Sequence, residues 1–176
     1  MSGGIPVVKN RNEKQEIPEA LYQSADQWMQ AAIDEARIGI FAKHGGPFGS
    51  VIVKDGVVVG RGHNTVLLDN DSTCHGEMNA IRDAEKNLGT YDLTGCVIYT
   101  TGEPCNMCLN ACLWANLDKV YYGSTIADNG QIGFRDAAYD EIFTGREKLG
   151  DYLTECDRDA CLKLFDEYLT TDRTIY

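Results

Sequence analysis

Residues 74–77 read Cys74-His75-Gly76-Glu77, and residues 103–108 read Glu103-Pro104-Cys105-Asn106-Met107-Cys108. Together the two stretches offer one imidazole and two thiols, which are donors that zinc prefers. A structural zinc site usually has four protein ligands, whereas a catalytic site has three and keeps one position for water. We therefore predict a zinc site held by His75, Cys105 and Cys108, with one position left for a water molecule.

Both stretches are expected to lie at the start of a helix. Pro104 suits the first turn of one helix, and apolar spacing indicates another that begins near His75. The positive end of a helix favours anions and lowers the pKa of a thiol, so Cys105 and Cys108 are expected to bind as thiolates. Glu77 is the candidate for proton transfer, and general acid–base catalysis contributes roughly a hundredfold to ten-thousandfold.

Three other interpretations of these residues stay open at this point. Cys112 or Cys74 could complete a structural zinc site as a fourth ligand. Cys-x-x-Cys also occurs as a redox pair, although that interpretation does not explain His75 and Glu77. A lone His-x-Glu indicates nothing more than a helix start. The joint pattern is more specific than any of its parts.

The composition is that of an ordinary globular domain. The 176 residues, of which 43% are hydrophobic and 24% charged, suffice for one hydrophobic core. A net charge of -11 without a basic run argues against a nucleic acid as substrate. No apolar run reaches the length of a membrane span, and the N-terminus lacks a signal-peptide core, so a cytoplasmic protein is expected. Seven cysteines without a signal peptide do not suggest a disulfide framework.

The chain is expected to form a polar N-terminal extension at residues 1–18 and a single domain at 19–176. Helical periodicity predicts a first helix that ends near Lys43. Ser24 and Gln27 are predicted to begin that helix as a capping box.

Strand patterns alternate with helical patterns along the rest of the chain. Asp55-Gly56 is a strong hairpin turn signal between two runs rich in β-branched residues. Helices that alternate with strands in this way would cover both faces of one sheet. The sequence therefore predicts an α/β fold. The predicted strands are 48–54, 57–62, 96–100 and 119–123, with an ambiguous stretch at 151–154, and residues 64–73 are predicted as a polar loop.

The chain resembles the cytidine deaminase-like superfamily of zinc nucleobase deaminases over roughly residues 22–168, because that family carries H-x-E followed by P-C-x-x-C. Within the superfamily it is most similar to bacterial-type guanine deaminases. The matching residues are Gly46-Pro47-Phe48-Gly49, Gly62-His63-Asn64, Asn70-Asp71-Ser72-Thr73, Glu103-Pro104-Cys105-Asn106-Met107-Cys108, Trp114-Ala115, Gly133-Phe134-Arg135-Asp136, Tyr139 and Tyr176.

This resemblance implies a three-layer α-β-α sandwich around a mixed sheet of about five strands. It implies one zinc ion per chain on His75, Cys105 and Cys108, with Glu77 as the proton shuttle. In bacterial-type guanine deaminases the reaction converts guanine to xanthine and ammonia. The resemblance also implies a homodimer, in which the C-terminal segment can be exchanged between subunits.

The resemblance further implies a set of substrate contacts. Asn64 would hydrogen-bond the base, Phe48 would line its pocket, and Tyr176 would close that pocket. Asp136 would contact the amidine edge of the purine or assist proton transfer. Separately, the expected position of Cys105 at a helix start suggests that its main-chain amide supports the developing oxygen. Ordinary structural roles compete with these: a turn residue for Asn64, a core residue for Phe48 and a helix N-cap for Asp136.

Two departures from the guanine deaminase pattern leave other functions open. Gly76 stands where those enzymes usually have alanine, and fungal cytosine deaminases carry His-Gly-Glu, so cytosine deamination is the alternative. Arg135 stands where the family often has a second acidic residue.

A tRNA-adenosine deaminase shares the motif layout, but the acidic charge opposes a polyanion. A protein that uses zinc only structurally is the remaining alternative. We expect a small nucleobase as the ligand and no membrane partner.

Overall fold

The computed structural model describes residues 26–143 and a few single positions further along the chain. The chain divides into two compact units, Met1–Ala137 and Ala138–Tyr176, and each is described by itself. The expected extension at residues 1–18 and the C-terminal Tyr176 lie outside the described residues. The division into an extension and a single domain at 19–176 stays a prediction.

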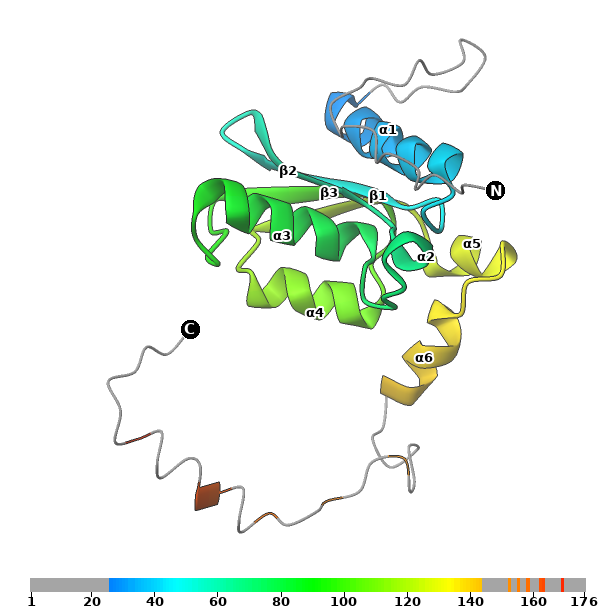
Figure 1. Ribbon diagram of the computed structural model, residues 1–176, viewed down its shortest axis with the longest axis vertical. Helices are drawn as coiled ribbons and strands as arrows, with labels where there is room; N and C mark the ends of the chain where they lie inside the picture. Colours follow the sequence, from blue (N-terminus) through cyan, green and yellow to red (C-terminus); the bar gives the residue numbers. More distant parts are fainter. Residues whose placement is uncertain are drawn as a thin grey trace, which may run out of the picture. The chain divides into compact units, whose positions relative to one another are not determined.

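The first unit is built on a mixed sheet (Figure 1). Its order is β2-β1-β3-β4, with β1 antiparallel to both neighbours and β3 parallel to β4. The described residues thus contain four strands, one fewer than the resemblance implies. The Asp55-Gly56 turn is as predicted, because both residues have positive φ, 49° and 75°, as a type I′ turn requires. The strands are β1 (Gly49–Lys54), β2 (Val57–His63), β3 (Cys96–Gly102) and β4 (Lys119–Ser124).

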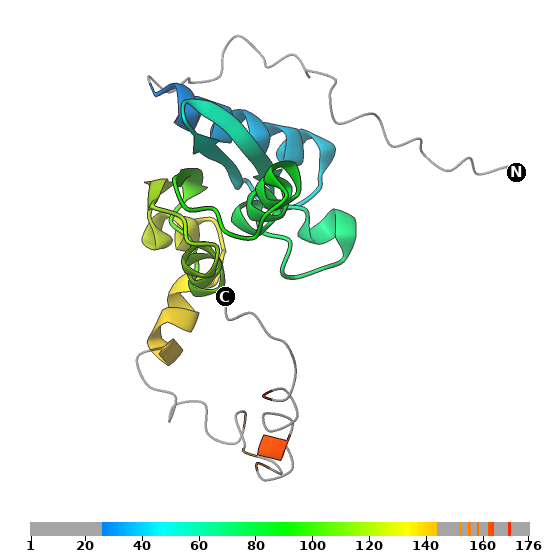
Figure 2. The ribbon, with the colours of Figure 1, turned by 90° about the vertical axis from the view of Figure 1, so that its left-hand side faces the viewer.

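Helices cover both faces of this sheet (Figures 1 and 2). Helix α1 (Gln27–Ala42) lies on one face, and α3 (Gly76–Leu88) and α4 (Asn106–Trp114) lie on the other. Because side chains alternate along a strand, Val51 and Val53 pack with Ala32 of α1. Ile52, between them, packs in the core of the opposite face with Ala80 of α3. The predicted three-layer α/β fold is confirmed.

The predicted start of the first helix was wrong. Asp26 caps α1, since its Oδ1 accepts hydrogen bonds from the main-chain N–H groups of Trp28 and Met29 at 2.8 and 2.9 Å. Ser24, the predicted cap, precedes the described residues. Pro104 likewise stands before α4 rather than in its first turn, because Cys105 is the N-cap residue of that helix.

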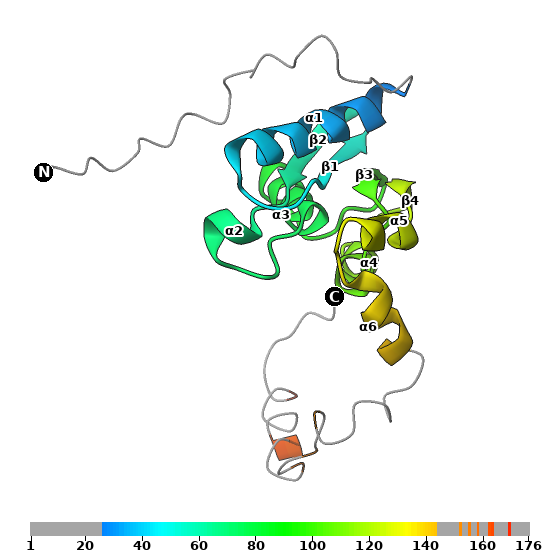
Figure 3. The same cartoon turned by 90° about the vertical axis from the view of Figure 1, so that its right-hand side faces the viewer.

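Two short helices were not predicted. Helix α2 (Val66–Asp69) lies within the predicted polar loop, and α5 (Ile126–Gln131) follows β4 directly and lies beside the end of that strand (Figure 3). One turn of helix is too short to show a hydrophobic period. Helix α6 spans Asp136–Phe143. None of the described helices combines the length and apolar character that a membrane span needs.

Strand β2 and helix α3 approach each other main chain to main chain at Gly62. A Cβ atom at this position would lie 2.4 Å from the Ala80 nitrogen and 2.6 Å from the Gly76 oxygen. We expect Gly62→Ala to lower the free energy of unfolding by about 1–3 kcal/mol, as overpacking does elsewhere. Urea denaturation measures this change.

Gly130→Ala in α5 is the matched control, because a Cβ there has nothing within 4 Å. Its unfolding free energy should stay within about 1 kcal/mol of the parent. Equal stability of the two variants would contradict the close approach of β2 and α3.

Candidate active site

The two predicted ligand stretches meet at the N-termini of α3 and α4. His75 is the N-cap residue of α3 and Cys105 that of α4, and both have extended backbone. The His75 Nδ1 atom lies 3.6 Å from the Sγ atom of Cys105 and 3.6 Å from that of Cys108. All three potential ligand atoms lie within 4.8 Å of one another. The structure therefore brings the three predicted ligands together.

These distances fit a zinc ion. Tetrahedral zinc with Zn–S of about 2.3 Å and Zn–N of about 2.0–2.1 Å separates its nitrogen and sulfur ligands by about 3.5–3.6 Å. Both nitrogen–sulfur distances here are 3.6 Å. One imidazole with two thiols is also a donor set of catalytic zinc sites that keep an open position.

Among the cysteines of the described residues, none joins this site as a fourth ligand. Among the described residues, the group of side chains that could hold a metal consists of His75, Cys105 and Cys108. Cys112 lies in the core with Ile98, on the face of the sheet that α3 and α4 cover. Burial raises the pKa of the Cys112 thiol to about 12, so it favours the protonated form that binds metal poorly. The geometry thus opposes a closed structural site completed by Cys112.

The two ligand cysteines form an asymmetric pair. The hydrogen bond from Cys108 lowers the pKa of Cys105 to about 4, and the neighbouring His75 acts in the same direction. The same hydrogen bond, together with burial, raises the pKa of Cys108. The His75 pKa is raised by its hydrogen bond to Cys105. A cation that enters the site therefore meets one thiolate that is already formed.

Glu77 lies in the first turn of α3, close to these ligands. Its side chain is buried, with the residue only 6% exposed. Burial raises the pKa of its carboxyl group, because a charge is poorly solvated there. A carboxyl group with a raised pKa takes up and releases protons nearer to neutral pH. This placement suits the predicted proton shuttle, which stays a proposal.

One pocket is lined by two of the three predicted ligands, His75 and Cys105, and by most of the predicted substrate contacts. Asn64 is buried, and its Oδ1 accepts a hydrogen bond from the Val66 N–H at 3.2 Å, so it is both a turn residue and a pocket residue. Phe48 packs edge-on against Phe134, with ring centroids 4.8 Å apart. Residues lining the pocket are Phe48, Asn64, His75, Glu77, Glu103, Cys105, Asn129, Phe134 and Asp136.

Three of these lining residues were not predicted as site residues. Glu103 Oε2 accepts from the Ile126 N–H at 2.9 Å, and the Asn129 side chain accepts from Ser124 Oγ at 2.8 Å. Glu103 and Phe134 stand within the motifs that carry the family resemblance, so a signal for them was present. Asn129 had none, because it reaches the pocket through α5, which was not predicted. Arg135 is exposed and is not among the lining residues.

A comparison of the sequence with known protein families agrees with the geometry of the metal site. Residues 22–124 match the zinc-binding region of the cytidine and deoxycytidylate deaminases. The chain belongs to this deaminase family. It is therefore a zinc-dependent aminohydrolase, and His75, Cys105 and Cys108 are the donors in the described residues that fit its metal.

Individual members of the deaminase family extend the comparison. Guanine deaminase from Bacillus subtilis (strain 168) is 45% identical over 118 residues, which are 66% of this chain and 76% of that protein. The X-ray structure of guanine deaminase from Bacillus subtilis matches this chain with a TM-score of 0.79 and 36% sequence identity. The match covers 88% of this chain and 99% of that one. A tRNA-specific adenosine deaminase from Aquifex aeolicus (strain VF5) is 36% identical over 107 residues, 61% of this chain and 70% of that protein.

Proposed function

We propose that this deaminase hydrolyses guanine to xanthine and ammonia. The observation that carries the proposal is the pocket itself, in which buried Glu77 and the aromatic pair of Phe48 and Phe134 lie beside two of the three metal donors, His75 and Cys105. The similarity to the guanine deaminase of Bacillus subtilis, of whose structure 99% is covered, supports guanine as the substrate.

The reaction replaces the carbon–nitrogen bond of the exocyclic amine by a carbon–oxygen bond. A bound zinc ion supplies Lewis acidity, which brings the pKa of a water molecule to about 7. Glu77 accepts the water's proton, delivers it to the ring nitrogen and assists the departure of ammonia. The main-chain N–H of Cys105, at the start of α4, stabilises the oxygen that develops negative charge.

The remaining pocket residues hold the base. The aromatic pair of Phe48 and Phe134 supplies an apolar wall for a flat ring. Asn64, whose Oδ1 is already bonded to the Val66 N–H, hydrogen-bonds an edge of the base. Asp136, at the first position of α6, contacts the amidine edge. A small nucleobase is thus bound on its face and on its edges.

The glycine at position 76, which first suggested cytosine, has a packing explanation. A Cβ atom there would lie 3.1 Å from the Phe48 carbonyl oxygen and 3.3 Å from Ser50 Oγ. Such a methyl group would point at β1, so Gly76 reflects the tight contact between β1 and α3. This residue therefore does not favour cytosine over guanine. The net charge of -11 weighs against tRNA, despite the similarity to a tRNA-specific adenosine deaminase.

Ammonia release separates the candidate substrates directly. Purified zinc-loaded protein is mixed in parallel with guanine, guanosine, cytosine, adenine and an adenosine-containing tRNA anticodon stem-loop, and ammonia is measured over time. We expect release from guanine. Release from cytosine alone would contradict the purine proposal, and release from an adenosine-containing tRNA anticodon stem-loop alone would assign the chain to the tRNA-specific enzymes.

A homodimer, exchange of the C-terminal segment and a cytoplasmic location belong to the same proposal. They are supported by the resemblance to guanine deaminases and by the sequence features described above. Light scattering coupled to gel filtration tests the dimer, since a mass close to twice 19.5 kDa is expected.

The proposed closure of the pocket by Tyr176 is tested by removing that residue. We expect the deletion to raise KM for guanine about fivefold or more, because stacking of a base on an aromatic ring contributes roughly 1–3 kcal/mol. Tyr176→Phe keeps the ring and should keep a KM close to that of the parent. Steady-state kinetics measures both, and unchanged constants after the deletion would remove Tyr176 from the pocket.

A further inference from the structure

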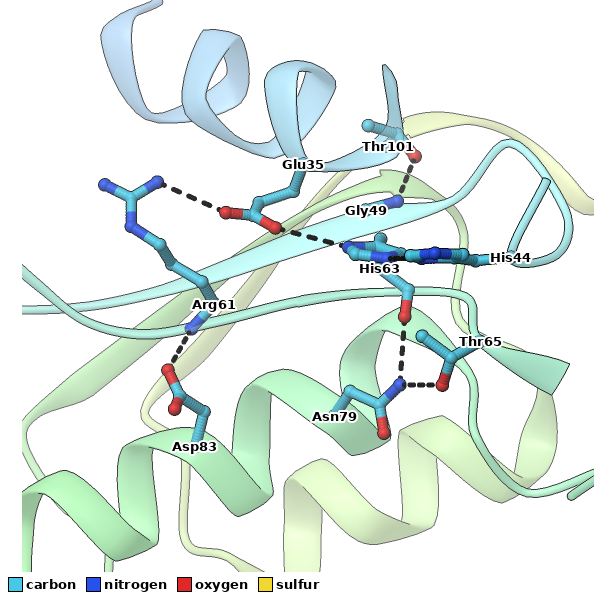
Figure 4. Close-up of polar contacts among 9 residues, drawn as sticks. All are labelled: Glu35, His44, Gly49, Arg61, His63, Thr65, Asn79, Asp83 and Thr101. Carbon is cyan, nitrogen blue, oxygen red and sulfur yellow. Dashed lines mark hydrogen bonds and ion pairs between the residues drawn. The ribbon is translucent and has the colours of Figure 1, made fainter. Parts of the chain in front are cut away.

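Two histidines outside the metal site contact each other at the end of β2 (Figure 4). The Nδ1 atom of His44 lies 2.9 Å from the Nε2 atom of His63. The ring planes differ by 19° and the centroids are 5.2 Å apart. Because the centroids are much further apart than the nitrogens, the two nitrogens lie between the rings, edge to edge. This is the geometry of an in-plane N–H···N hydrogen bond.

Acidic and basic groups extend the contact on the far side of His63 (Figure 4). The other ring nitrogen of His63, Nδ1, lies 3.4 Å from Glu35 Oε2, and both side chains are largely buried, at 14% and 13% exposure. Arg61 lies 3.7 Å from the second oxygen of Glu35. A carboxylate partner keeps the proton on Nδ1 of His63, so Nε2 is the acceptor for the N–H of His44.

The two histidines flank the pocket residue Asn64. On the β2 side, the Asn79 side chain donates to the His63 carbonyl and to Thr65 Oγ1 at 2.9 and 2.8 Å, so α3 holds the residues on both sides of Asn64. On the other side, Gly45 follows His44. A Cβ at Gly45 would lie 2.0 Å from Asn64 Oδ1, so the loop main chain lies directly against the carboxamide.

His44 also anchors the segment that follows Asn64. Its carbonyl oxygen accepts hydrogen bonds from the N–H groups of both Leu67 and Leu68 of α2, each at 3.0 Å. The Asn64 side chain in turn accepts from Val66 N–H. The position of His44 therefore sets the loop on one side of the carboxamide and α2 on the other, and the side-chain hydrogen bond to His63 ties that position to the sheet.

We infer that His44 and His63 are positioning residues that hold Asn64 for binding of the base. The inference rests on the proposed function, in which Asn64 contacts the substrate. Without the hydrogen bond between the two rings, the sheet no longer fixes His44, so the loop and α2 can shift away from the carboxamide.

Charged groups around the pair come from β2 and from three helices. Glu35 of α1 faces His63, Arg61 of β2 faces Glu35, and Asp83 of α3 accepts from the Arg61 main-chain N–H at 2.9 Å. In α2, Asp69 accepts from Thr65 Oγ1 at 2.6 Å. These contacts hold His63 and the residues next to it against the neighbouring elements, so the His63 ring offers His44 a fixed partner.

Two substitutions of His44 separate positioning from general stability. His44→Ala removes the bond, and we expect KM for guanine to rise about threefold to tenfold with kcat within about twofold. His44→Asn places an amide N–H near the former Nδ1 atom, so it can donate to His63 Nε2 as the imidazole does. It should restore a KM close to that of the parent. Zinc content should be equal in all three proteins.

A second measurement does not depend on activity. In ¹⁵N NMR, an N–H···N hydrogen bond gives a scalar coupling between the His44 and His63 nitrogens. His44→Ala removes this hydrogen bond, so the resonances of the Asn64 carboxamide should shift in that variant. A parent protein that releases ammonia from no base refutes the proposed function, and the Asn64 resonances then decide the inference. The inference is overturned if His44→Ala keeps the parent KM in an active protein, or if it leaves the Asn64 resonances unchanged.

Discussion

Glu77→Gln is expected to abolish deamination while the protein keeps its zinc. Glutamine has nearly the same shape as glutamate but cannot take up a proton from water and pass it on. General acid–base catalysis contributes roughly a hundredfold to ten-thousandfold, and Glu77 is proposed to serve in more than one proton transfer. We therefore expect a fall in kcat at or beyond the upper end of that range, with a much smaller change in KM.

Zinc content distinguishes a proton shuttle from a structural role. Glu77 is not among the three side chains that form the metal-binding group, so Glu77→Gln should bind as much zinc as the parent, measured by atomic absorption. A variant that loses both metal and fold would instead favour structural zinc. A variant with parental kcat would remove Glu77 from the reaction.

The raised pKa of Glu77 adds a pH-dependent expectation for the metal-free protein. Burial raises the pKa of this carboxyl group above its value in the unfolded chain, so the folded state binds more protons. Its contribution to stability is thus present at low pH and is lost as the pH rises through the folded-state pKa. Glutamine stays neutral throughout. In urea denaturation with a chelator, Glu77→Gln should therefore gain stability relative to the parent as the pH rises, and a constant difference would contradict the burial effect.

Cys105→Ala is expected to lose the metal. The two nitrogen–sulfur distances of 3.6 Å indicate that each thiol supplies one corner of a tetrahedral site. Removal of Cys105 leaves two protein ligands and also removes the group whose pKa is lowered to about 4. Zinc measured after dialysis against a weak chelator should fall from one ion per chain to near zero, and activity should fall with it.

Cys112→Ala is the matched control for this loss. Cys112 lies in the same helix, one turn after Cys108, but packs in the core rather than in the metal-binding group. Its alanine variant should keep the parental zinc content, with at most a modest loss of stability. Normal zinc content in Cys105→Ala would exclude Cys105 as a ligand, and zinc loss in Cys112→Ala would restore the fourth-ligand interpretation.

The ligand set was predictable because its information is local. A zinc ligand is identified by the chemistry of its side chain and by its spacing, and His75, Cys105 and Cys108 stand in two short stretches. The helix starts that present them follow from the same stretches. The hairpin at Asp55-Gly56 was predictable for a similar reason, since two adjacent residues with positive φ decide the turn.

The roles of individual pocket residues were harder to predict from the sequence. From the sequence, Phe48 was ambiguous between a core residue and a pocket residue. The structure decides this, because Phe48 contacts Phe134, a pocket residue far away in the sequence. Asn129 had no motif to mark it, because its place depends on α5 and on the hydrogen bond from Ser124. A contact between such distant residues leaves no periodic pattern in the sequence.

By itself the sequence determined the chemistry of this protein: three metal donors, one carboxyl group for proton transfer, and alternating helices and strands to present them. The tertiary structure alone decided what surrounds that chemistry. Only folding places His44 beside His63, closes the loop against Asn64, and buries Glu77 so that its pKa rises. The physical reason is that donor type and spacing are properties of short segments, whereas burial and hydrogen bonds between separate elements exist only after the chain has packed.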